Sequence, residues 1–185
     1  AIRAVWGNLA ESFLDTLSIG ERCVLGPDED TLTLAVSAAR LCLDRAGGGA
    51  GVGAVLLGTG TSPYATKAAA EVLKDALDLP ATALACDVQC AERSGSAALA
   101  LARGLVESGA VERALVVAAD PPNRHTAPGQ VLEYVASAGA AAYLVGAGPG
   151  LAELGRWTNH SWDQNDYFRD EGARLGQPGA GFDGR

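Results

Sequence analysis

Apolar residues along this chain follow two different spacings. In residues 29–46, 67–77 and 94–108 they recur at helical intervals, which predicts helices packed through one face. Shorter, continuous apolar runs separate these stretches and predict buried strands; they span residues 52–57, 81–85, 114–119 and 140–145. A last run, residues 151–157, is expected to pair as a fifth strand.

The predicted elements alternate in a regular order. Glu29 and Asp30 are expected in the first turn of the first helix, where negative charge suits the helix dipole, and Gly47 ends that helix. Strands that alternate with helices form βαβ units, so the fold class is α/β, with a mostly parallel sheet covered by helices on both faces. Residues 1–157 are expected to form this domain. Residues 158–185, rich in Asp, Asn, Gly and aromatic side chains, are expected to be an irregular excursion.

Composition narrows the class of protein. The 185 residues are 48% hydrophobic and 19% charged, which suits a globular unit rather than a disordered chain. The formal charge is -8 and Lys and Arg form no cluster, which argues against nucleic-acid or anionic-membrane partners. No apolar run reaches the roughly 18 residues of a membrane helix, and no secretory signal is present. The chain has no Met, so it is expected to be a fragment, a processed chain or a partial sequence.

The four cysteines, Cys23, Cys42, Cys86 and Cys90, lack the repeated CxxC spacing of a zinc site or a disulfide framework. They are interpreted as reduced thiols of a cytoplasmic protein, three of them filling the core. No metal site and no resident cofactor are predicted.

Three segments carry candidate chemistry. Residues 87–96 join a predicted strand to a helix start, where a nucleophile such as Cys90 would be stabilised by free N–H groups; a plain tight turn is the alternative. Residues 59–64 follow the first strand in the same way, as ligand loops of parallel sheets do, although such loops often only connect. Ser96 and the loop histidine His125 are candidate substrate-binding residues, while a lone loop histidine is more often solvated.

Taken together and in order, several segments resemble the amino-terminal half of HMG-CoA synthase, a thiolase-superfamily family, particularly its archaeal-type branch. They are GPDEDT at 26–31, GTGTSPYATK at 58–67, the turn at 86–99, LEY at 132–134 with AGAAA at 138–142, and DYFRDEG at 166–172. The resemblance implies a thiolase fold of two similar halves, of which this chain holds the first without its initial strand. It also implies that the absent half supplies a catalytic histidine, that the substrate is an acyl-CoA or acyl-carrier thioester, and that subunits dimerise through the strand at 114–119.

The chain departs from the family at two positions. Family members carry a nucleophilic cysteine two residues after the position of Cys90, where this chain has Glu92, and a glutamate base where it has Gly60. A thiolate forms an acyl-enzyme, but a carboxylate would form an unstable anhydride, and glycine cannot move a proton. Ordinary HMG-CoA synthesis is therefore not expected. Cys90 could act as nucleophile only by a two-residue slip, which the following SGSAAL run opposes.

A second family resemblance agrees with the replacement of the nucleophilic cysteine and the glutamate base. DED at 28–30, DVQ at 87–89 and NRHTAPG at 123–129 resemble the cysteine-less, HMG-CoA-synthase-like subunit of acyltransferase complexes that make acetylated phloroglucinols. That likeness implies a catalytic thiolase-like, ketosynthase-like sibling and a small OB-fold, zinc-ribbon-type subunit as partners in a hetero-oligomer.

Three hypotheses follow. The chain is an accessory, pseudoenzyme-like subunit of an acyl-CoA-processing complex, or an active enzyme in which Glu92 beside a dry pocket serves as base in decarboxylation or in retro-aldol or Claisen cleavage. The third is an acyl-CoA binding module without turnover. They leave open whether the chain is itself an enzyme.

Overall fold

The computed structural model describes residues 4, 18–130, 132–161, 167–170 and 172–178. These residues fall into two compact units, each described here by itself. The larger unit comprises Leu25–Asp120 and Gly139–Trp157, and the smaller one comprises Ala1–Val24, Pro121–Ala138 and Thr158–Arg185. None of the described helices is long and apolar enough to cross a membrane.

A four-stranded sheet forms the middle of the larger unit, in the order β2-β1-β3-β4. The strands are β1 (Val52–Gly58), β2 (Leu84–Val88), β3 (Arg113–Asp120) and β4 (Gly139–Gly146). β1 is parallel to both β2 and β3, while β4 is antiparallel to β3. The prediction of a mostly parallel sheet is confirmed, because the βαβ order of the sequence forces each connection to cross back over a face.

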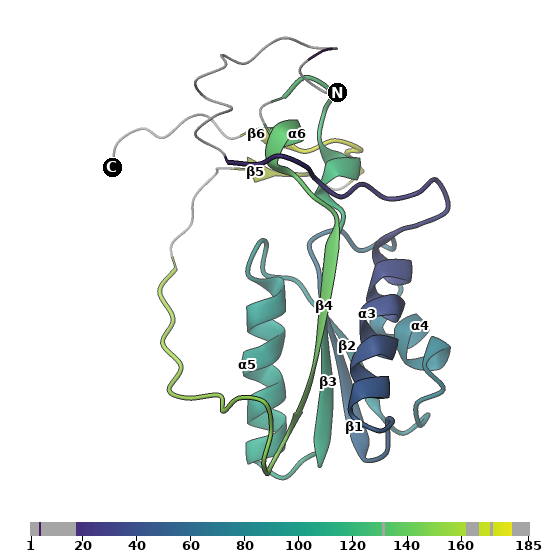
Figure 1. Cartoon of the computed structure of the whole chain (residues 1–185), viewed down its shortest axis with the longest axis vertical. Helices are drawn as coiled ribbons and strands as arrows, with labels where there is room; N and C mark the ends of the chain where they lie inside the picture. The colour runs from purple at the N-terminus through teal and green to yellow at the C-terminus, as the bar shows by residue number, and fades with distance from the viewer. Residues whose placement is uncertain (1–3, 5–17, 131, 162–166, 171, 179–185) are drawn as a thin grey trace. The chain divides into compact units, whose positions relative to one another are not determined.

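Helices cover both faces of this sheet, as predicted (Figure 1). α3 (Thr31–Arg45) and α4 (Ala69–Ala76) pack on one face, and α5 (Ser94–Glu107) packs on the other. Side chains alternate along each strand, so Val55 and Leu57 contact α3 and α4 while Ala54 and Leu56 contact α5. β1 and the interior of β3, residues 114–119, are therefore apolar because they are covered from both sides.

Two helix starts depend on aspartates. Asp30 is the N-cap of α3 rather than part of its first turn: its carboxylate accepts the Thr33 N–H at 2.9 Å, and Thr33 Oγ1 accepts the Asp30 N–H at 2.7 Å. α4 follows Ala68, which has no capping side chain. Its first N–H groups donate instead to Asp87 of β2, from Ala69 at 2.8 Å and Ala70 at 2.7 Å.

Several predicted boundaries are wrong. β2 begins at residue 84 rather than 81, because the residues after Pro80 first make a turn in which Ala83 N donates to Pro80 O at 2.9 Å. The structure assigns no strand to residues 151–157; Arg103 of α5 donates to the Gly155 carbonyl there. The helix predicted from residue 67 begins at Ala69, since Lys67 lies over the Tyr64 ring, 5.2 Å from its centroid.

The strand expected to form a dimer interface, residues 114–119, cannot do so through its edge. It lies in β3, which is hydrogen-bonded to β1 on one side and to β4 on the other. In the described part of the larger unit, the edges available for pairing are those of β2 and β4. Edge-to-edge pairing by this strand is therefore excluded, because the sequence shows that a strand is apolar but not whether it is central. Association of subunits stays a prediction.

The smaller unit contains short elements. They are η1 (Pro122–His125), α6 (Leu132–Val135), and an antiparallel pair of two-residue strands, β5 (Tyr167–Phe168) and β6 (Gln177–Pro178). Arg22 ties its first segment to α6, donating to Ala136 O at 2.9 Å and lying 3.9 Å from Glu133. Within the motif at 166–172, positions 166 and 171 lie outside the described residues.

Candidate functional site

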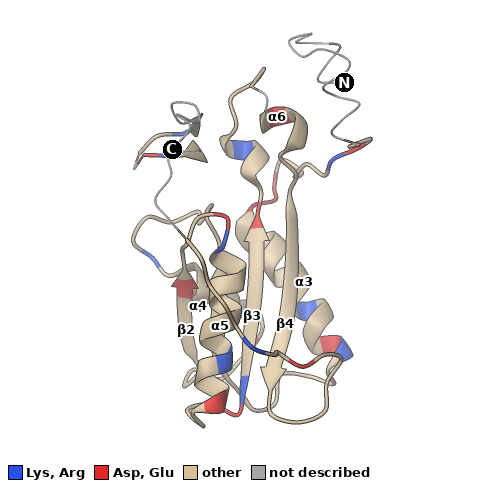
Figure 2. Ribbon diagram, turned by 90° about the vertical axis from the view of Figure 1, so that its left-hand side faces the viewer, with Lys and Arg blue, Asp and Glu red and all other residues tan. Residues whose placement is uncertain are grey.

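The carboxyl ends of three parallel strands bring the candidate segments of the larger unit together. Residues 59–61 follow β1, the turn at residues 89–93 follows β2, and Asp120 ends β3. Figure 2 shows acidic residues in red at the tips of β2 and β3, which the sequence identifies as Asp87 and Asp120. Because β1 lies between β2 and β3, its loop adjoins both neighbours. This is the edge at which α/β sheets place ligands.

Asp120 organises the loop after β1. Its Oδ1 accepts hydrogen bonds from Thr59 Oγ1 at 2.8 Å, from the Gly60 N–H at 2.9 Å and from Thr61 Oγ1 at 2.6 Å. Thr31, the first residue of α3, donates from Oγ1 to Thr61 O at 2.6 Å. Thr59 and Thr31 are each only 2% exposed, so these polar groups form a satisfied buried network rather than a solvated loop.

The turn after β2 is closed by Ser94. Its hydroxyl accepts the Cys90 N–H at 2.9 Å and donates to Ala91 O at 2.6 Å. Ala91 has φ +49°, a left-handed conformation that is uncommon for a residue with a side chain. The turn therefore holds a strained residue immediately before Glu92.

Glu92 and Cys90 are both exposed at this turn. Within the part of the chain that the structure describes, the Glu92 carboxylate makes no hydrogen bond or ion pair. Among the described residues Glu92 is not enclosed, and the dry pocket expected beside it stays a prediction. Glu92 precedes α5 by two positions, so the residue lies at the end of the helix where the dipole favours negative charge.

Gly60 faces the turn that carries Glu92. A Cβ atom built on Gly60 would lie 3.9 Å from the Ala91 carbonyl oxygen and 4.0 Å from Asp120 Oδ1. Both are ordinary van der Waals distances, and the φ of Gly60 lies outside the left-handed region, so the backbone leaves room for a Cβ atom there. The two positions singled out by the sequence are thus neighbours: a side chain at position 60 would extend from the loop beside the turn.

The other candidate residues fall into two places. Ser96 is exposed in the first turn of α5 and donates from Oγ to Arg93 O at 3.1 Å. His125 belongs to the smaller unit, where its Nδ1 lies 3.1 Å from Arg174 O and its own carbonyl accepts Gly176 N–H at 2.7 Å and the Tyr167 hydroxyl at 3.0 Å. Since a carbonyl only accepts, the neutral imidazole carries its proton on Nδ1, and Nε2 is left as an acceptor.

The cysteines are mostly at the surface. Cys23, Cys86 and Cys90 are exposed, so the prediction that three of the four fill the core is wrong. Cys42 alone is partly buried, and burial raises the pKa of its thiol, partly opposed by a backbone hydrogen bond from Leu144. Among the described residues, no group of three or more His, Cys, Asp or Glu side chains is placed to hold a metal ion.

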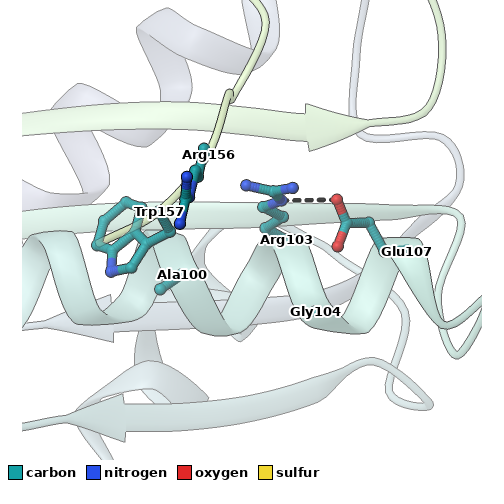
Figure 3. A pocket seen from close by; sticks show the side chains of 6 residues that line it. All are labelled: Ala100, Arg103, Gly104, Glu107, Arg156 and Trp157. Atoms are coloured by element: carbon teal, nitrogen blue, oxygen red, sulfur yellow. Dashed lines mark hydrogen bonds and ion pairs between the residues drawn. The ribbon is translucent and has the colours of Figure 1, made fainter. Parts of the chain in front are cut away.

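A separate pocket of about 390 Å³ lies on the outer side of α5 (Figure 3). Its lining consists of Ala100, Arg103, Gly104, Glu107, Arg156 and Trp157. Arg103 and Glu107 form an ion pair there, with Nε 2.6 Å from Oε1. Of the lining residues, Ala100 is the nearest along α5 to the turn that carries Glu92. It lies eight positions beyond Glu92, which corresponds to about 12 Å at the rise of an α-helix. The pocket is therefore distinct from the site at the strand ends.

The chain is 37% identical over its 185 residues to the hydroxymethylglutaryl-CoA synthase of Methanosphaera stadtmanae. The chain is HMG-CoA synthase-like, within the thiolase superfamily. The HMG-CoA synthase-like chain covers 53% of that relative, so it spans about half the length of the curated relatives it matches, namely their amino-terminal half. No protein-family model matches it.

Solved structures agree with this assignment. MvaS in complex with 3-hydroxy-3-methylglutaryl coenzyme A superposes with a TM-score of 0.84 at 29% identity, over 99% of the HMG-CoA synthase-like chain and 44% of MvaS. A 3-oxoacyl-(acyl-carrier-protein) synthase III gives a TM-score of 0.73 at 29% identity, over 83% of this chain and 46% of that one. The α/β fold is thus that of the amino-terminal thiolase half.

Two site residues of the HMG-CoA synthase-like chain were not predicted from the sequence. Asp120 was absent from the candidates because its partners lie about 60 positions earlier in the chain. Ser94 is part of the SGSAAL run, in which the sequence alone gives it no separate role. A polar residue directly after an apolar strand, and a serine at a helix start, were the signals that could have indicated them.

Proposed function

We propose that this chain is an accessory subunit, or half-subunit, of an acyl-CoA-processing complex, and that it does not itself form an acyl-enzyme. The observation that carries the proposal is the pairing of Gly60 with the Glu92 turn. Where the family resemblance expects a base and a nucleophilic cysteine, this chain has Gly60, beside the Ala91 carbonyl, and Glu92, the next residue of that turn. Attack on a thioester needs a nucleophile that gives a stable acyl intermediate, and neither residue supplies one.

The substrate class follows from the relatives. Hydroxymethylglutaryl-CoA synthases and a 3-oxoacyl-(acyl-carrier-protein) synthase share the fold, so the proposed ligand is an acyl thioester of CoA or of a carrier protein. The proposed partners are a thiolase-like sibling or a second copy, with a small OB-fold, zinc-ribbon-type subunit as a further component. The free edges of β2 and β4 support association by strand pairing.

Intact-mass spectrometry of the native complex after incubation with acetyl-CoA tests the proposal. Acetyl mass on a sibling chain alone is the expected result. Acetyl mass on this chain, mapped to Cys90, would overturn it and make Cys90 the nucleophile.

A second function is favoured by one observation, the placement of the exposed Glu92 carboxylate before α5. If no chain acquires acetyl mass, Glu92 as a base in decarboxylation or carbon–carbon cleavage becomes the function to test. Glu92→Gln, which keeps the size of the side chain and removes its basicity, should then abolish turnover while the complex still assembles. If the parent protein and the Glu92→Gln variant both bind the thioester and neither turns it over, the chain is an acyl-CoA binding module.

A further inference from the structure

We propose that Ser94 is the positioning residue of this site: its buried hydroxyl fixes the direction in which the turn presents residue 92. The inference rests on the proposed function in one respect: it takes residue 92 as the residue that the turn directs toward the site.

The hydroxyl bridges the two ends of the turn. It accepts from the Cys90 N–H at 2.9 Å and donates to the Ala91 carbonyl at 2.6 Å, while Ser94 as a residue is only 1% exposed. Backbone bonds reinforce the same loop, since Arg93 N donates to Cys90 O and Ser94 N to Ala91 O, each at 3.1 Å. A side chain that both accepts and donates in this way determines the peptide orientation on either side of Ala91.

These bonds oppose the strain at Ala91. A left-handed conformation is unfavourable for a residue with a side chain, so the turn would relax if nothing held it. The Ser94 hydroxyl contributes two hydrogen bonds to the strained form. Removing the hydroxyl should therefore shift the turn away from this conformation.

Ser94, at the start of α5, is itself held against the sheet. A Cβ atom on Gly58 would come within 2.5 Å of the Ser94 carbonyl oxygen, and one on Gly95 within 2.7 Å of the Ala118 Cβ. The start of α5 is therefore in close contact with β1 and β3. Loss of the hydroxyl should free the turn at residues 90–92 without displacing the helix.

A reporter thiol tests this inference in the full protein. In a Cys90→Ala, Glu92→Cys variant, the introduced thiol stands before α5, and the helix dipole should lower its pKa below the ordinary value of about 8.5. The rate of alkylation by iodoacetamide is measured against pH for the peptide that contains residue 92, by mass spectrometry, because Cys23 and Cys86 are also exposed. Adding Ser94→Ala should raise the midpoint of this profile by at least about 0.5 pH unit, because the thiolate no longer faces the helix start.

Two further variants make the result decisive. Ser108→Ala is the matched control: at the other end of α5 its hydroxyl also donates to a carbonyl three positions earlier, Leu105 O at 3.1 Å, and the midpoint should not move. Ser94→Thr keeps the hydroxyl and should keep the lowered midpoint, which separates positioning from loss of fold. Thermal unfolding of each variant is recorded alongside.

The outcomes separate the two proposals. An ordinary midpoint with Ser94 intact would mean that position 92 is not held at the helix start, and the proposed function would lose its premise. A lowered midpoint that Ser94→Ala leaves unchanged would overturn only the role of Ser94.

Discussion

At the scale of single residues, two glycines two positions apart, Gly58 at the end of β1 and Gly60 in the loop that follows, have opposite requirements. Gly58 is in contact with backbone, whereas Gly60 has room for a side chain. Both belong to the segment GTGTSPYATK at 58–67, in which the sequence alone does not distinguish them. Their difference comes from the start of α5, which packs against the first and leaves the second open.

This difference predicts a stability test. Gly58→Ala should destabilise the protein by about 1–3 kcal/mol, because its new methyl group would lie 2.5 Å from the Ser94 carbonyl oxygen. Gly60→Ala should stay within about 1 kcal/mol of the parent, since its nearest atoms are 3.9 Å away. Urea unfolding of both variants checks the contrast, and equal losses would contradict the packing described at these positions.

The open space at position 60 also predicts that thioester chemistry can be restored. The double substitution Glu92→Cys with Gly60→Glu should give a chain that acquires acetyl mass from acetyl-CoA in the assembled protein, at a rate at least about tenfold above either single variant. Intact-mass spectrometry over time measures it. Equal rates for the double and single variants would show that position 60 does not serve position 92.

At the scale of elements, α4 depends on a residue from another element. Asp87 of β2 accepts from two N–H groups at the start of α4, in place of a local cap. Asp87→Ala should therefore cost about 0.5–2 kcal/mol, and Asp87→Asn, which keeps one acceptor oxygen, should cost less. Chemical denaturation measures both. Asp44→Ala, exposed on α3, is the control and should show no comparable loss.

Lys74 of α4 gives a pH test of the same helix. Its pKa is raised, mainly by the hydrogen bond with Glu71, whose Oε2 lies 2.5 Å from Nζ. Because the pKa is raised, the stabilisation by this pair is fully present below the ordinary pKa of lysine. It is lost as the pH rises through the pKa that Lys74 has in the folded protein. Glu71→Gln should thus lower the melting temperature at neutral pH, and the gap to the parent should close above about pH 10.5.

The order of the four sheet strands and of the helices between them could be predicted from apolar periodicity, most clearly for β1 and β3, which are buried on both faces. The expected strand at residues 151–157 is not found, and β2 and β4 are partly exposed edge strands rather than buried ones. The start of β2 could not be predicted, because the residues after Pro80 are largely apolar but form a turn. At the site, positions 60 and 92 were found through family resemblance. The approach of Gly60 to the Ala91 carbonyl and the role of Asp120 depend on strand order, which no local pattern contains.

At the scale of the whole molecule, the sheet of the larger unit has two unpaired edges within the described residues. β4 is the longer, and its residues are all apolar or glycine, without the charge or proline that usually protects an edge strand. Tyr143 on this strand is 53% exposed. Such an edge favours association even in a chain with a formal charge of -8.

The 185-residue chain by itself should therefore associate as its concentration rises. Tyr143→Lys, which places a charge on the edge strand, should shift sedimentation toward the single chain. Tyr64→Lys is the matched control, because Tyr64 is similarly exposed, at 41%, but lies in a loop. If both substitutions act alike, general charge rather than the edge of β4 governs association.

One carboxylate oxygen, Oδ1 of Asp120, holds the loop after β1 in place before any ligand arrives. Ordering a loop residue on binding costs roughly 1–2 kcal/mol in conformational entropy. A ligand at this edge avoids that cost, so its affinity should be set by the contacts it makes rather than by the folding of the loop around it. The preordered loop would then select ligands by their shape. It would rearrange little to accommodate a ligand of another shape.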